Sequence, residues 1–298
     1  MNNKRRLFST LLCVAALTAG LFVSGCGSDK AGGIGSVVSS VVDGGSDEKA
    51  AAKLNTLIDA TNRFNGDNAT WGQNYADSLA KLKGGFQEGA IGRQPHYDTL
   101  KEALEQSKKE GSTFKEVDTE RDNVLNVLNE LVPTFKDLKA YDDSKAYMND
   151  GGAKGKELAA KYVAQVEKFD AAYAKFNDAL NKANTEQTKK QIEKLKKDGK
   201  KGYAAAMEST LRLTTLVENV EKAPRNADKQ AVEKELNEIQ TLLKSINNDR
   251  GEVLVNSYNS VVGSVRQVLT DANENNLNEM IENFNNYIES YNNTTPDQ

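Results

Sequence analysis

The sequence predicts an all-α protein: an elongated antiparallel helical bundle that follows a cleaved lipoprotein signal peptide and a flexible tether. Only four prolines occur in 298 residues, so long stretches are free to be helical. Apolar residues recur at helical spacing through most of the chain, and no alternating apolar and polar run is long enough to predict a strand. We expect a signal peptide at 1–25, a tether at 26–46 and a single all-α domain at 47–298.

The first residues are typical of a secretory signal. Lys4, Arg5 and Arg6 precede the apolar segment 7–23, and Val23-Ser24-Gly25-Cys26 follows. Small residues before a cleavage point are typical of signal peptides, and the cysteine after them makes the motif resemble a bacterial lipobox. An ordinary secretory signal or a single membrane span are the alternatives, but the apolar run is short for a span.

The lipobox resemblance implies a membrane-anchored, extracytoplasmic lipoprotein with a diacylglycerol thioether on Cys26, cleaved before that residue. Cys13 leaves with the signal peptide, so the mature chain is expected to have neither a free thiol nor a disulfide. Its net charge changes from −4 to −7, because 1–25 holds three basic residues and no acidic one. Gly27 follows the lipidated cysteine, at the position where Asp favours retention in the inner membrane of enteric bacteria. A glycine there indicates that the protein lies in the outer membrane if the source is Gram-negative.

The segment after Cys26 is rich in Gly and Ser, as flexible linkers are. Within it, 34–42 carries Ile and Val residues on one helical face. The segment is either a short helix lying on the bilayer or plain tether. Gly flanks and β-branched residues make a weak isolated helix, which favours the tether.

The body begins with a predicted helix whose N-cap is Ser46, a residue type that accepts hydrogen bonds from the first-turn amides. Asn65-Gly66 is expected to end it, and Thr70 to begin a second helix. The glycines in 84–92 predict a loop, without the spacing of a phosphate-binding motif.

Pro95 suits the first turn of a third helix, which Gly111 closes. A longer helix is expected from Ser112 or Thr113 to Tyr141, with a kink at Pro133 because proline removes a hydrogen bond within the helix. The next helix is expected to begin after Asp150, its N-cap, and to end at about Lys197. Four more are expected in the rest of the chain, at 203–220, 232–246, 255–269 and 277–291.

One stretch resembles a known family. Tyr141, Tyr147, Asp150, Lys154, Gly155 and Lys156 resemble the Tyr…Tyr-x-x-Asp…Lys-Gly-Lys pattern of the YiiG-like group of uncharacterised helical bacterial lipoproteins. The segments 53–62, around Pro133, and 257–262 fit the same group, although Thr61 stands where the group usually has Tyr. The resemblance implies a lipid-anchored helical envelope protein and transfers no catalytic residue.

Two groups of polar residues near this stretch are candidate sites. Lys154 and Lys156 lie at a predicted helix N-terminus, where free amides and positive charge favour an anion. The oxygen-bearing residues before them do not have the spacing of a calcium loop, so a helix cap with solvated acids is favoured over a metal site. These residues are Asp142, Asp143, Asn149 and Asp150.

A run of seven lysines between positions 189 and 201 could meet anionic lipid, a polymer or nucleic acid. Nucleic acid is not expected for an acidic protein outside the cytoplasm, and a solvated helix end is favoured. The lysines concerned are Lys189, Lys190, Lys194, Lys196, Lys197, Lys200 and Lys201.

The sequence favours a non-enzymatic role. Its only histidine, His96, excludes sites that need several histidines and is expected to lie on the surface. No nucleophile elbow is present, and we predict no metal and no cofactor. Two functions remain open: a helical module that binds an envelope protein, a polymer or a small anion, and an envelope hydrolase whose carboxylates meet only in the fold.

Overall fold

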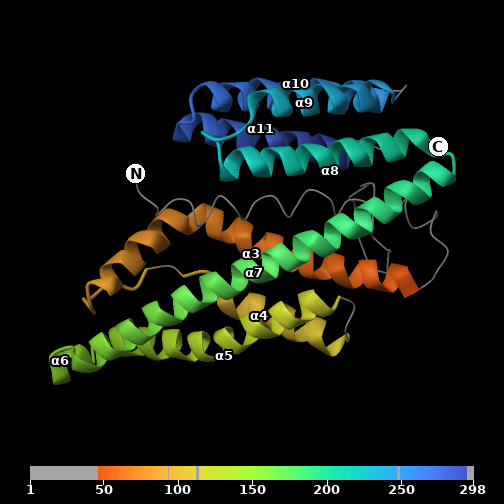
Figure 1. The fold of residues 1–298 in the computed structure, drawn as a ribbon. Helices are drawn as coiled ribbons and strands as arrows, with labels where there is room; N and C mark the ends of the chain where they lie inside the picture. The colour runs from red at the N-terminus through yellow and green to blue at the C-terminus, as the bar shows by residue number, and fades with distance from the viewer. Residues whose placement is uncertain (1–45, 93, 112–113, 247–248, 294–298) are drawn as a thin grey trace. The chain divides into compact units, whose positions relative to one another are not determined.

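The computed structural model describes residues 46–92, 94–111, 114–246 and 249–293. The predicted signal peptide, Cys26, nearly all of the tether and the 34–42 segment lie outside the described residues. Within the described residues all regular structure is helical and no strand occurs (Figure 1). The predicted all-α class is therefore confirmed.

The described helices follow one another along the chain, with the longest connection at 84–96 between the first two. They are α3 (Ser46–Lys83), α4 (Tyr97–Lys109), α5 (Lys115–Asp143), α6 (Tyr147–Asp150), α7 (Ala153–Lys197), α8 (Lys201–Lys222), α9 (Lys229–Lys244), α10 (Asp249–Thr270) and α11 (Glu274–Asn293). The chain divides into two compact units. Of the described residues, unit 1 holds 56–183 and unit 2 holds 46–55 and 184–293. Because α3 and α7 run through both units, the division does not test the single predicted domain, which stays a prediction.

An aromatic core holds unit 1 together. The ring of Phe64 on α3 lies 5.8 Å from Phe169 and 5.3 Å from Tyr173, both on α7. Tyr97 of α4 joins them, with its ring 5.0 Å from Phe169. All four side chains are buried, and edge-on ring pairs of this kind stabilise a core beyond the area they bury. These contacts tie α3, α4 and α7 together.

The predicted helix break at Asn65-Gly66 is wrong. α3 continues through both residues to Lys83. A Cβ added at Gly66 would meet nothing within 4 Å, so this glycine serves no close approach. Its cost within a helix is about 1 kcal/mol, which the buried side chains of Phe64 and Tyr75 on either side outweigh.

α5 also runs unbroken, from Lys115 to Asp143, with Pro133 inside it. Pro133 is exposed, so its ring faces water and not the packed side. Val124, Leu128 and Leu131 are fully buried on the other side. The apolar stripe thus continues across the proline and keeps the helix in place.

Unit 2 contains a group of four helices. α8 contacts α9 and α11, and α10 contacts α8, α9 and α11. Tyr258 of α10 is fully buried and donates a hydrogen bond to the Leu236 carbonyl of α9 at 2.5 Å. The hydroxyls of Thr210 on α8 and Tyr287 on α11 are 3.0 Å apart. The hydroxyls of Tyr258 and Tyr287 therefore both have a partner, as burial requires. Among the residues described, no helix combines the length and apolar character needed to cross a bilayer.

Candidate functional site

The start of α7 holds the two lysines of the predicted anion site. Lys154 and Lys156 are both exposed. The carboxylate of Asp150 accepts the amides of Gly152, at 2.9 Å, and Lys154, at 3.1 Å. Asp150 therefore caps α7, as the sequence predicts. Its carboxylate already accepts the backbone amides that a bound anion would use. The anion site at Lys154 and Lys156 stays a prediction.

The residues that carry the family resemblance form a corner between α5 and α7. The Tyr141 hydroxyl donates to Asp150 at 2.5 Å, and this bond, aided by the amides of Gly152 and Lys154, lowers the pKa of the Asp150 carboxyl. Phe86, from the connection after α3, places its ring 5.2 Å from Tyr141. A Cβ at Gly155 would lie 2.6 Å from atoms of both rings. Packing and capping thus explain Tyr141, Asp150 and Gly155 of the pattern.

Gly155→Ala is expected to destabilise unit 1 by about 1 to 3 kcal/mol, because the added methyl group overlaps two rings in a packed corner. Denaturant unfolding of the purified chain measures this change. Gly66→Ala is the control: the new Cβ meets nothing, and alanine favours a helix. Equal stability of the Gly155 variant and the wild type would show that the rings move away without cost.

Asp170 of α7 is a half-buried carboxyl group that sequence reasoning missed. Burial raises its pKa to about 6, Lys83 opposes this rise and Glu167 adds to it. Lys83 is bonded to the exposed Glu167 at 2.8 Å, and no hydrogen bond to Asp170 is found within the described ranges. Its spacing four residues after Val166 and three before Tyr173 places it at the edge of the buried stripe. That position was the available signal.

The charge of Asp170 acts on two buried tyrosines. It raises the pKa of Tyr75, on α3, and of Tyr97, on α4, although burial is the largest cause for both. The hydroxyls of these two tyrosines are 2.9 Å apart, and the Tyr162 hydroxyl donates to Gln94. This arrangement lets Asp170 gain or lose a proton near neutral pH beside a buried tyrosine network.

The second half of α7 presents the predicted lysine run. Ile192 and Leu195 are buried in a cluster with Ala204 and Met207 of α8, which fixes the rotation of α7 in unit 2. At 3.6 residues per turn, four lysines fall within an arc of about 140° on the side away from Ile192 and Leu195. We call them the lysine face: Lys189, Lys190, Lys194 and Lys197.

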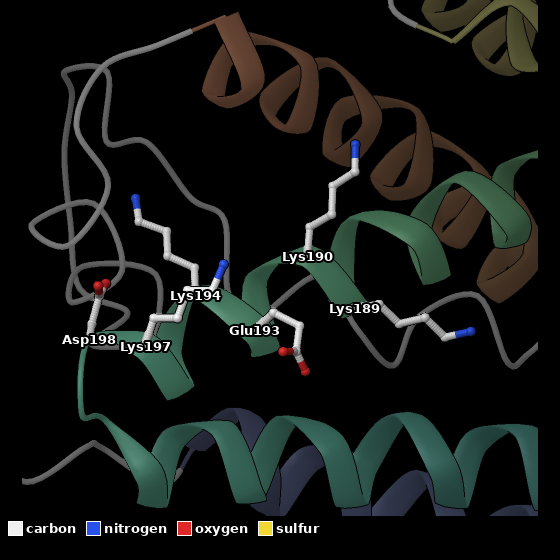
Figure 2. Close-up of a pocket in the computed structure, with 6 residues that line it drawn as sticks. All are labelled: Lys189, Lys190, Glu193, Lys194, Lys197 and Asp198. Carbon is white, nitrogen blue, oxygen red and sulfur yellow. The ribbon is translucent and has the colours of Figure 1, made fainter.

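Figure 2 shows these side chains extending from the helix, and together with Glu193 and Asp198 they line an open hollow. All six lining residues lie on or directly after α7, so the hollow is a helix face and not an enclosed pocket. Lys196, Lys200 and Lys201 belong to the run but not to the lysine face. The Lys196 ammonium pairs with Glu208 at 2.9 Å and with Glu193 at 3.4 Å. The lysine face has no ion-pair partner within the described part of the chain.

No metal site is found in the residues that the structure describes: no three His, Cys, Asp or Glu side chains are grouped to hold an ion. His96 occupies the N-cap position of α4 and is exposed, which confirms the expected surface histidine.

Comparison with known proteins gives a family but no activity. The family described as "Protein of unknown function (DUF3829)" matches residues 48–297, and the chain belongs to this family. No curated protein and no solved structure matches the chain.

Proposed function

We propose that this member of a family of unknown function is a lipid-anchored bacterial envelope protein that acts as a non-enzymatic helical interaction module. The observation that supports the interaction role is the lysine face, a set of exposed or half-buried cations held on one side of α7 in an acidic chain. Cations without partners attract an anionic surface, polymer or small ligand.

The anchor is proposed from the sequence. Val23-Ser24-Gly25-Cys26 follows a basic start and an apolar segment, which supports acylation of Cys26 and an extracytoplasmic location. Acyl chains such as palmitate then hold the protein on the membrane, the outer membrane in a Gram-negative source, and several chains hold far better than one. The YiiG-like assignment belongs with this proposal: it rests on the Tyr141–Lys156 pattern and is compatible with the family match.

Cys26→Ala is expected to abolish incorporation of a labelled fatty acid into the protein, because the thiol is the proposed attachment atom. Metabolic labelling followed by immunoprecipitation measures this directly. Cys13→Ala is a matched control that should retain the label, since Cys13 lies in the apolar segment that cleavage removes. Label on the Cys26 variant would refute acylation at this residue.

The same cells test the interaction role. In-cell crosslinking should capture an anionic envelope component with the wild-type chain and much less of it with Cys26→Ala, because the tether keeps the lysine face near the membrane. If neither chain captures any component, the interaction role is wrong.

An envelope hydrolase is the alternative, and Asp170 is the observation that favours it. A half-buried carboxyl group with a pKa near 6, next to a second carboxylate on Glu167, has properties of a general acid. If a screen of envelope polymers finds turnover with the wild type, Asp170→Asn should abolish it. Turnover that survives this substitution would exclude Asp170 as the acid.

A further inference from the structure

We infer that the lysine face of α7 binds the anionic phospholipid surface of the bilayer in which the Cys26 lipid is inserted. The inference rests on the proposed lipid anchor and names the partner of the lysine face. Three properties of the described residues carry it: the orientation of the face, its uncompensated charge and its place in the same unit as the start of α3.

The orientation follows from packing. Ile192 and Leu195 bury one side of α7 against α8, so the opposite side must face outward. Lys189, Lys190 and Lys197 are exposed, and Lys194 is half-buried. A lysine whose stem lies along the helix while its ammonium reaches outward is well suited to contact phosphate groups in a flat surface.

The charge of the segment is opposite to that of the chain. Residues 189–201 hold seven lysines and two acids, whereas the whole chain has a net charge of −4. One of these acids, Glu193, is paired with Lys196. The four lysines of the lysine face have no ion-pair partner among the described residues. They can therefore gain energy from an external anionic surface, and clusters of four or more such cations beside a membrane are typical of acidic-lipid binding.

The predicted tether leads into unit 2, the unit that holds the lysine face. α3 begins at Ser46, and its described residues up to Asn55 belong to unit 2, as does α7 from position 184. Ser46 lies 20 positions after Cys26. Even fully extended, a chain of this length reaches at most about 70 Å. Unit 2 is therefore held close to the bilayer, where even weak headgroup contacts are populated.

The control lies on the same helix. Lys161, Lys168 and Lys175 are exposed and have no ion-pair partner within the described residues, but they belong to unit 1 and alternate with acids such as Glu167 and Asp178. Substituting three lysines in either set changes the net charge equally. Only the set in the lysine face is expected to affect contact with lipid.

The test uses the lipidated full chain in two nanodiscs, one of neutral phosphatidylcholine and one with anionic phosphatidylglycerol added. An amine-reactive reagent and mass spectrometry measure the labelling rate of each lysine. We expect labelling of the four lysines of the lysine face to be at least about fivefold slower in the anionic disc, because each lysine near such a surface strengthens binding by about fivefold. High salt should remove this difference by screening.

Two variants sharpen the result. In K190Q/K194Q/K197Q the remaining Lys189 should lose its protection in the anionic disc, whereas in K161Q/K168Q/K175Q it should keep it. Equal labelling in both discs, with the protein inserted, would overturn the inference and leave the anchor intact. Failure to insert into either disc would overturn the lipid anchor, and this inference with it.

Discussion

Phe169→Ala is expected to lower the free energy of unfolding by about 3 to 5 kcal/mol, the largest loss among the substitutions considered for this protein. The Phe169 ring lies within 5.8 Å of Phe64, Tyr97 and Tyr173, from three helices. Its removal leaves a cavity among rings that pack in fixed orientations, and the surrounding helices can close it only in part. Chemical denaturation of the purified chain, followed by circular dichroism, measures the loss.

Met148→Ala provides the control in the same unit. Met148 is 76% exposed, and surface substitutions of this kind usually change stability by less than about 0.5 kcal/mol. If Phe169→Ala cost no more than this control, the aromatic cluster would not be the core of unit 1.

The shape of the unfolding transition is a second result. One shared transition would support the single predicted domain, whereas two transitions would separate unit 1 from unit 2.

The helices were largely predictable because buried side chains recur at 3.6-residue spacing. The predicted end of a helix near Lys197 is confirmed, as is the following helix, observed at Lys201–Lys222. The error at Gly66 has a physical cause. Sequence signals for a helix end are local, whereas α3 is kept helical through its glycine by distant partners such as Tyr173 on α7. No local pattern contains that information.

The candidate sites were predictable where charge alone defines them. The lysine run is visible in the sequence, but the separation of Lys196 from the lysine face depends on Glu208 of α8, which only the fold brings near. Asp170 was missed for the same reason. Its perturbed pKa depends on burial and on Lys83, which lies 87 positions earlier.

Asp170→Asn is expected to stabilise the protein at neutral pH, in contrast to the neighbouring Phe169 substitution. The pKa of Asp170 is raised from 3.8 to about 6, chiefly by burial. The unfolded chain therefore releases this proton at lower pH than the folded chain does. The free energy of unfolding of the wild type therefore falls as the pH rises from about 4 to about 6. Above pH 7 the whole loss, about 2 to 3 kcal/mol, is present. Asparagine does not ionise, so the variant avoids this cost.

The difference in the free energy of unfolding between Asp170→Asn and the wild type must therefore depend on pH. Unfolding midpoints at pH 4 and pH 8 are expected to show the variant gaining about 2 to 3 kcal/mol relative to wild type between these values. Any constant cost of burying the amide cancels in that comparison. Asp178→Asn removes an exposed carboxylate from the same helix, and its effect should change little with pH. A flat difference for Asp170→Asn would mean that water reaches this carboxylate, and the case for Asp170 as a general acid near neutral pH would fall with it, because both depend on the same burial.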